Sequence, residues 1–128
     1  MKKIFLIVLF TVIVSCKSDK NTQQDFSAKS SETEINPQLE LGKKLFEGKG
    51  TCIACHKPTK KIIGPSIVEI AKIYKEQNAD MVAFLKEQSK PIVDPSQYEV
   101  MKTNFSITKT MTNEELEAIE SYMYSFLE

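Results

Sequence analysis

The stretch TCIACH, residues 51–56, is the part of this 128-residue sequence that decides the fold. Its two thiols, Cys52 and Cys55, are three residues apart, and the imidazole of His56 follows at once. His56 is the one histidine of the chain, and the two thiols are two of its three cysteines. Chemistry that needs an imidazole or a pair of neighbouring thiols therefore has to centre on this stretch.

The order Cys-x-x-Cys-His is typical of covalent haem c attachment. Two thiols at this spacing can reach the two vinyl groups of one porphyrin and form thioethers, and the next residue brings an imidazole under the iron. A thioredoxin-like redox pair would need a βαβ context, and a structural zinc site would need four ligands where this stretch supplies three. The sequence therefore predicts one covalent haem c with iron, attached at Cys52 and Cys55 and ligated by His56.

The third cysteine, Cys16, ends a segment with the features of an export signal. A basic start, MKK, is followed at residues 4–14 by an almost wholly apolar run of eleven residues without charge. A helix that spans a bilayer takes about 20 residues, so this run fits the hydrophobic region of a secretory signal instead. Residues 13–16, IVSC, resemble a bacterial lipobox, which implies cleavage before Cys16 and its acylation. The alternative is an ordinary N-terminal anchor with an incidental Cys16.

This reading divides the chain into three parts. Residues 1–15 are predicted to be a lipoprotein signal peptide, and residues 16–36 an acylated Cys16 with a flexible tether. The tether has only two large apolar residues, Phe26 and Ile35, and cannot bury enough surface to offset the entropy of ordering it. With Cys16 on lipid and the other two cysteines on haem, no thiol of an exported protein is left free. Residues 37–128 remain as the folded domain.

The folded domain shows helical periodicity and no alternating strand pattern, so the predicted fold class is all-α. Asn36 and Pro37 suit the start of the first helix, and Thr112 with Glu115 forms a capping box for the last. Asn78 or Asp80 is expected to open the third helix, and a polar loop with a possible short helix through residue 100 follows it. The expected buried faces lie at residues 39–46, 67–74, 81–88 and 116–126. About 90 residues make a marginal core, to which a large buried cofactor would add apolar contacts.

Residues 37–127 resemble a class I monohaem cytochrome c of the small bacterial type. The sequence GKKLF at residues 42–46, just before the Cys-x-x-Cys-His stretch, resembles the N-terminal helix of that family, in which a glycine and an aromatic residue cross the C-terminal helix. Ile119 and Tyr122 are the matching positions on the last helix. The resemblance implies a small cytochrome c-like fold, with N- and C-terminal helices crossing around one covalently bound haem.

The same resemblance suggests two further site residues. The sequence IIGPS at residues 62–66 resembles a Gly-Pro segment of the family, which implies that the Pro65 carbonyl accepts a hydrogen bond from His56 and orients its ring. Met101 lies where the family carries its sixth iron ligand, although Lys102 follows it where a proline is usual. Met111 precedes the Thr112 cap in hydrophobic-staple geometry. If Met101 is instead a core methionine, the iron is open or bound by lysine.

A haem with two filled axial positions implies one-electron transfer, and no catalytic acid, base or nucleophile set stands out, so we expect an electron carrier and not an enzyme. The alternatives are a haem-based sensor or small-ligand binder with a labile sixth ligand, and a fixed subunit of a respiratory complex. The lipid anchor implies attachment to a membrane of the cell envelope, with the domain facing the periplasm or the exterior.

Charge bears on the partners. The chain has 17 Lys and 17 Asp plus Glu, a net charge of zero, which argues against nucleic-acid binding. Six lysines flank the haem-attachment stretch and could steer an acidic redox protein, such as an oxidase, a reductase or a quinol-oxidising complex, although plain solvated surface explains them equally well. They are Lys43, Lys44, Lys49, Lys57, Lys60 and Lys61. We expect the protein to be a monomer.

Overall fold

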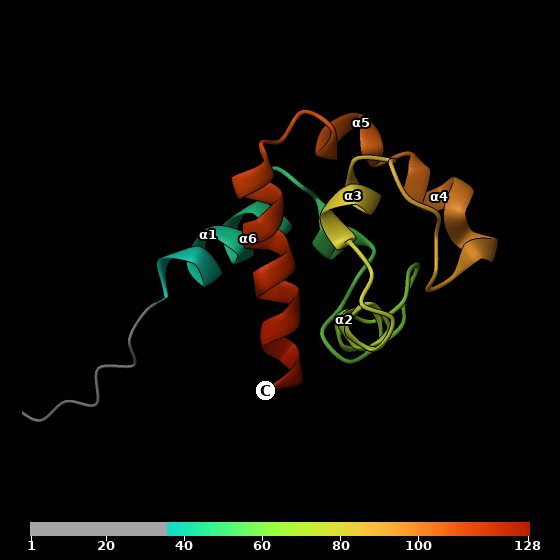
Figure 1. Ribbon diagram of the computed structural model, residues 1–128, viewed down its shortest axis with the longest axis horizontal. Helices are drawn as coiled ribbons and strands as arrows, with labels where there is room; N and C mark the ends of the chain where they lie inside the picture. Colours follow the sequence, from blue (N-terminus) through green and yellow to red (C-terminus); the bar gives the residue numbers. More distant parts are fainter. Residues whose placement is uncertain (1–35) are drawn as a thin grey trace, which may run out of the picture. The chain divides into compact units, whose positions relative to one another are not determined.

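The computed structural model describes residues 36–128, which form a helical domain (Figure 1). The predicted signal peptide, Cys16 and the tether up to residue 35 lie outside the described residues. Within residues 36–128 there is no strand, and one isolated β-bridge joins His56 and Lys61. The helices in chain order are α1 (Pro37–Glu47), a 3₁₀ turn (Cys52–Ala54), α2 (Ile67–Glu76), α3 (Met81–Leu85), a 3₁₀ turn (Pro95–Gln97), α4 (Tyr98–Lys102), α5 (Phe105–Thr108), α6 (Asn113–Tyr124) and a terminal 3₁₀ turn (Ser125–Leu127).

The first and last helices, α1 and α6, cross each other at Gly42 (Figure 1). A Cβ built on Gly42 would overlap the Ala118 carbonyl oxygen and would lie 2.8 Å from the Cβ of Tyr122. The backbones can approach this closely because glycine has no side chain. One turn further along α1, the Phe46 ring packs on the Tyr122 ring with their centroids 5.5 Å apart. The all-α fold with crossing terminal helices, expected from the sequence, is confirmed.

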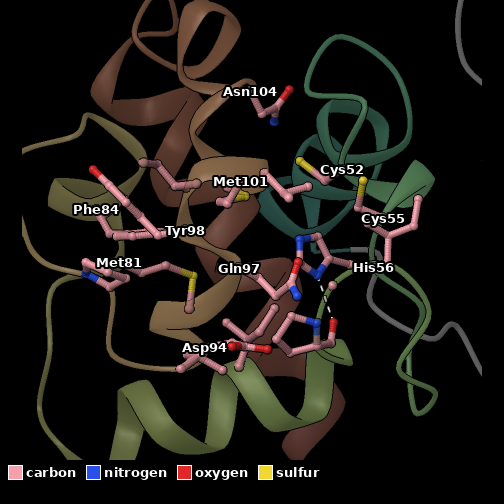
Figure 2. A pocket seen from close by; sticks show the side chains of 18 of the residues that line it. Cys52, Cys55, His56, Met81, Phe84, Asp94, Gln97, Tyr98, Met101 and Asn104 are labelled. Atoms are coloured by element: carbon pink, nitrogen blue, oxygen red, sulfur yellow. Dashed lines mark hydrogen bonds between the residues drawn. The ribbon is translucent and has the colours of Figure 1, made fainter.

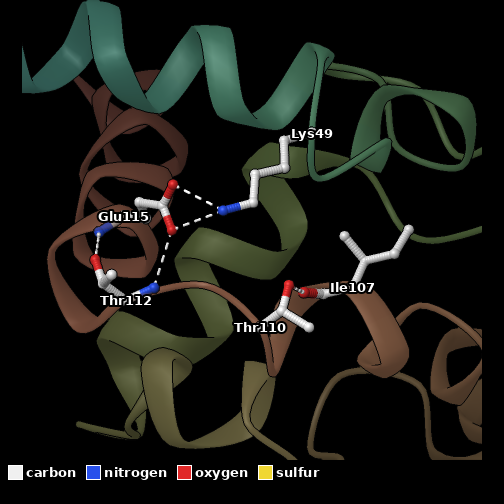
Figure 3. A network of polar contacts seen from close by, with 5 residues as sticks. All are labelled: Lys49, Ile107, Thr110, Thr112 and Glu115. Carbon is white, nitrogen blue, oxygen red and sulfur yellow. Dashed lines mark hydrogen bonds and ion pairs between the residues drawn. The ribbon is translucent and has the colours of Figure 1, made fainter.

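Side-chain caps mark where the helices begin. The Asn36 side chain accepts from the backbone N–H of Gln38 at 3.0 Å, with Pro37 as the first helical residue of α1. Ser66 caps α2 and Asp80 caps α3, so Asp80 fills the place for which the sequence offered Asn78 as an alternative. Thr112 and Glu115 form the predicted capping box of α6, and Glu115 also binds Lys49, whose two distances to the carboxylate oxygens are both 2.9 Å (Figure 3).

The third helix is shorter than the expected span 81–88. It ends at Leu85 because Glu87 adopts a left-handed backbone with φ 60°. The Glu87 N–H donates to the Phe84 carbonyl and the Gln88 N–H donates to the Ala83 carbonyl, both at 2.8 Å. This is the bonding of a Schellman motif, in which glycine usually takes the left-handed position. The bend brings the Glu87 carboxylate close to the basic residues at the ends of α4 and α5.

Two short helices, α4 and α5, lie in the segment between α3 and α6. The short helix expected up to residue 100 is present and extends to Lys102, whereas α5 was not expected. Met101 consequently lies within α4 and not in an irregular loop. Phe105 of α5 is buried, and the Thr108 hydroxyl donates to the Leu85 carbonyl at 2.5 Å, so α5 is fixed to the end of α3.

The hydrophobic core lies between α6 and the helices α1, α2 and α3. It includes Met111 and Leu116, which lie on either side of the Thr112 cap, as expected for a hydrophobic staple. None of the helices among residues 36–128 has the length and apolar character that crossing a membrane requires.

Candidate functional site

The TCIACH stretch forms a tight turn that points its reactive side chains into one cavity. Thr51 has a left-handed backbone with φ 52°, and the Cys55 and His56 N–H groups donate to the Cys52 carbonyl at 3.1 and 3.0 Å. These bonds curl the backbone through a single turn. Figure 2 shows the side chains of Cys52, Cys55 and His56 together on one side of the cavity.

The His56 ring is held by the segment that follows it. Its Nδ1 lies 2.8 Å from the Pro65 carbonyl oxygen (Figure 2), and because a carbonyl can only accept, Nδ1 carries the proton. The lone pair of Nε2 is then available to a metal. Burial lowers the pKa of His56, partly offset by the bond to Pro65, so the ring is held neutral at physiological pH, the form that binds metals.

Gly64 gives the His56 ring its second constraint. A Cβ built on Gly64 would overlap the ring at Cε1 and would lie 2.8 Å from Nδ1. The Gly64 N–H donates to the Cys55 carbonyl at 2.9 Å, and the Ile67 N–H donates to the Lys57 carbonyl at the same distance. The backbone of residues 64–67 is thereby fixed alongside the turn, with the ring between them.

The buried environment of Cys52 disfavours its thiolate form. Burial raises the pKa of Cys52 to about 11, and the Cys52 Sγ donates weakly to the Gly50 carbonyl at 3.4 Å. A thiol in this state is a poor nucleophile by itself, which argues against a redox-active or catalytic cysteine. Cys52 and Cys55 make no disulfide with each other.

The cavity has a volume of about 250 Å³ and a mainly apolar lining. The turn with its two thiols forms one wall, and residues of α3 and α4 form the opposite wall, among them Phe84, Tyr98 and Met101 (Figure 2). The lining continues at the base with Ile119 and Met123 of α6. A slot between an imidazole and an apolar wall, with two thiols at its edge, matches the shape and chemistry of a flat, apolar macrocycle held by thioethers.

The methionines of the domain occupy different places around this cavity. Met81, Met101 and Met123 line it, whereas Met111 is absent from its lining and packs near Gly50 within the core. Met81 and Met123 are buried on helix faces, as expected for core methionines. Met101 is only half-buried and lies on the wall opposite the Cys-x-x-Cys-His turn (Figure 2).

Sequence reasoning missed the polar residues at the cavity. Asp94, Gln97, Thr51 and Asn104 all line it, and the Lys61 ammonium lies 3.0 Å from Asp94. The hydrogen bond from the Ser96 hydroxyl, together with the ion pair to Lys61, holds the pKa of Asp94 below its usual range. These residues belong to irregular segments, in which spacing along the chain says little about proximity. The one sequence signal for this part of the cavity was the proline at position 95, which begins the 3₁₀ turn directly after Asp94.

Two comparisons with known proteins bear on the site. The family model for cytochrome c matches residues 39–126, which include the turn, the Gly64–Pro65 segment, α4 and all of α6. No curated protein matches the chain in sequence.

Proposed function

Because this chain belongs to the cytochrome c family, we propose that it is a one-electron carrier with a single haem c, ligated by His56 and Met101. Members of the family transfer electrons with a covalently bound haem and its iron, and haem-based electron transfer therefore holds for this chain. The haem would supply a one-electron iron couple whose potential is raised by a thioether ligand. Beyond this family function, we propose the iron ligands, a single haem and the cellular location.

Covalent attachment is assigned to Cys52 and Cys55. Each thiol would add its S–H bond across a vinyl double bond, so a C–S bond forms and the hydrogen goes to the neighbouring vinyl carbon. Their placement on a single turn next to His56 supports this assignment, since all three side chains line the same cavity. The raised pKa of Cys52 leaves few competing thiolate reactions.

The two ligands of the haem iron from this chain would be His56 and Met101. The Pro65 carbonyl orients the imidazole and increases its basicity by accepting the Nδ1 proton at 2.8 Å. The observation that carries the proposal is that the oriented imidazole and the half-buried Met101 line one apolar cavity (Figure 2). With both positions filled, the site exchanges electrons and not substrates.

The experiment that tests the proposal is a haem analysis of the purified protein. The haem should stay with the denatured chain during acid–acetone extraction, at one haem per chain, and the reduced-minus-oxidised spectrum should titrate as a single one-electron step. Haem that extracts into acetone, or a protein with no such spectrum, would rule the proposal out.

The proposed partner is a redox protein with an acidic docking surface. Two exposed apolar residues that line the cavity, Ile63 and Val100, are 56 % and 49 % exposed and would stand at its mouth. Lys57 and Lys60, both exposed, belong to the same segment as Ile63. A small apolar contact bordered by lysines suits a brief encounter with an acidic partner and needs no large interface. We propose that the protein acts as a monomer in such encounters.

The proposed location is the cell envelope, with a lipid on Cys16 as the membrane anchor. Its support is the apolar run that ends in IVSC at residues 13–16.

A haem-based sensor remains the second candidate. Met101 lies in a helix of five residues, and Lys102 follows where a rigid proline would stabilise the ligand segment. A weak sixth ligand would yield to carbon monoxide rapidly, whereas a firmly held one makes its binding slow, so the rate at which the reduced protein binds carbon monoxide separates the two functions.

A further inference from the structure

Asn104 lies at the junction between the helix that carries Met101 and the next helix. Its backbone N–H donates to the Met101 carbonyl at 2.9 Å. Its own carbonyl accepts from the N–H groups of Ile107 and Thr108 at 3.0 and 3.1 Å. The position of Asn104 therefore sets the end of α4 and the start of α5 together.

The side chain of Asn104 reaches across the cavity wall to the haem-attachment turn. Its Nδ2 donates to the Gly50 carbonyl at 3.0 Å, and its Oδ1 accepts from the Thr51 hydroxyl at 3.2 Å. The two contacts fix the orientation of the amide, because a carbonyl can only accept. Both ends of one amide are thus bound to two consecutive residues that lie more than 50 positions earlier in the chain.

The turn that Asn104 holds is strained. Thr51 is β-branched and has φ 52°, a left-handed conformation that such residues rarely adopt. A backbone of this kind persists only where its surroundings enforce it. Thr51 also occupies the N-cap position of the 3₁₀ turn that begins at Cys52, so its backbone conformation sets the direction of the first thiol. Asn104 supplies two of the bonds that hold this conformation.

We propose that Asn104 is a positioning residue that locks the Met101 segment to the haem-attachment turn and thereby keeps the sixth ligand in place. The inference rests on the proposed function for the role of Met101. Other contacts hold the same segment from the opposite side, where Thr108 binds Leu85 and Glu87 binds Lys109. Asn104 is the residue that ties it to the turn.

Haem attachment makes this lock more important. In the free thiol state, the Gly50 carbonyl accepts from both Cys52 Sγ and Asn104 Nδ2. A thioether sulfur has no proton to donate, so attachment removes the first of these donors. Asn104 then remains as the side-chain donor that holds Gly50, and through Gly50 the start of the turn.

The test compares four variants of the holoprotein. Asn104→Ala removes both bonds to the turn, and Thr51→Val removes one of them. Thr51→Ser keeps the hydroxyl and serves as the conservative rescue. Ser106→Ala is the matched control, because Ser106 donates to the Thr103 carbonyl and its bond stays within the same segment. The readouts are the rate of carbon monoxide binding, the near-infrared sulfur-to-iron band of the oxidised protein and amide hydrogen exchange.

The lock predicts that carbon monoxide binds Asn104→Ala about tenfold faster than wild type, and Thr51→Val about threefold faster, since each lost hydrogen bond frees the ligand segment. Thr51→Ser and Ser106→Ala should behave as wild type. Equal rates in Asn104→Ala and Ser106→Ala would overturn the inference. If Asn104→Ala does not fold, Thr51→Val decides: the threefold change supports the lock, and an unchanged rate refutes it.

Hydrogen exchange separates this inference from the proposed ligation. A wild-type protein without the sulfur-to-iron band would overturn ligation by Met101, whatever Asn104 does. In that case two backbone amides still report on whether Asn104 holds the two segments together. The Ala54 N–H donates to the Thr51 carbonyl in the turn, and the Thr108 N–H donates to the Asn104 carbonyl in the other segment. Faster exchange of both amides in Asn104→Ala than in Ser106→Ala supports a lock between the two segments, and equal exchange refutes it.

Discussion

The His56 ring packs directly against the backbone of Gly64, so closely that a Cβ at Gly64 would lie 2.8 Å from Nδ1 and 3.2 Å from Nε2. The ring is also held by the carbonyl of the next residue, Pro65, to which Nδ1 donates. A side chain at position 64 would therefore have to push the ring away from that carbonyl and from the cavity.

The first prediction follows for Gly64→Ala. Because the displaced ring loses its orienting bond, we expect the yield of His56-ligated holoprotein to fall by about tenfold or more. Absorption spectra of the purified protein measure this yield. Ser66→Ala is the control, since it removes the cap of α2, worth about 1 kcal/mol, and leaves the ring contact intact. Full ligation in Gly64→Ala would contradict the packing described.

The second prediction concerns the crossing of α1 and α6. Gly42→Ala would place a methyl group on the Ala118 carbonyl and 2.8 Å from the Cβ of Tyr122. Forcing the helices apart should cost about 1–3 kcal/mol, which lowers the Tm by about 4 °C or more in a domain of this size. Leu41→Ala, at a position 42 % exposed on the same helix, should change stability by less than about 0.5 kcal/mol. Thermal unfolding of both holoproteins would show whether they differ.

The Cys-x-x-Cys-His turn and the crossing of α1 and α6 were predictable because both leave a pattern in the sequence. Cys52, Cys55 and His56 are adjacent in sequence, and a Cys-x-x-Cys-His turn brings such neighbours together in almost any context. Gly42 and its partner helix follow from amphipathic periodicity combined with a family resemblance. The Pro65 bond to His56 was expected from the same resemblance and is present at 2.8 Å.

The segment between α3 and α6 was less predictable, because its structure depends on contacts distant in sequence. α5 has only four residues, too few for a periodic signal, and it is fixed by the bond from Thr108 to Leu85. The early end of α3 depends on a glutamate, Glu87, in a position that favours glycine. The Asn104 contacts join residues more than 50 positions apart, for which one sequence carries no local signature.

The third prediction is a dependence of stability on acid. The bond to Lys109, together with the charge of Lys102, lowers the pKa of Glu87 below its usual range. A carboxylate with a depressed folded pKa stabilises the fold above its unfolded pKa, and this contribution is lost as the pH falls through the folded pKa. Denaturant unfolding between about pH 5 and pH 2 should therefore show a shallower loss of stability in Glu87→Gln than in wild type.

Glu76→Gln is the control for this prediction. It removes a carboxylate from an exposed pair within α2 and should follow the wild-type curve. Coinciding curves for all three proteins would refute a role for Glu87.

The fourth prediction concerns the N-terminus, for which IVSC at residues 13–16 is the evidence. Mass spectrometry of the mature protein should find a chain that begins at Cys16 and carries diacylglycerol. Cys16→Ala should block both acylation and processing, and the protein should leave the membrane fraction or keep its uncleaved signal. At least two acyl chains are expected to hold the wild type firmly, because one chain gives only marginal binding. An unmodified N-terminus, or cleavage at another residue, would remove the lipid anchor from the proposal.

The fifth prediction identifies the sixth ligand by exchanging each methionine for leucine. Leucine keeps the volume of methionine but has no sulfur, and such exchanges cost less than about 1.5 kcal/mol, so loss of ligation is separated from loss of the fold. Met101→Leu should abolish the near-infrared sulfur-to-iron band of the oxidised protein. It should also lower the midpoint potential, since the thioether favours the reduced iron, and admit carbon monoxide to the reduced protein.

The controls are the other methionines of the domain, which differ in whether they line the cavity. Met81→Leu and Met123→Leu change residues that line the cavity but are buried on helix faces, and Met111→Leu changes one that lies outside the lining. All three should keep the band, the potential and the resistance to carbon monoxide. If Met81→Leu loses the band and Met101→Leu keeps it, the ligand comes from the start of α3, and Asn104 then locks a wall of the cavity that carries no iron ligand. If no single exchange removes the band, the sulfur ligand is not unique, and a second methionine at the cavity replaces Met101 when it is lost.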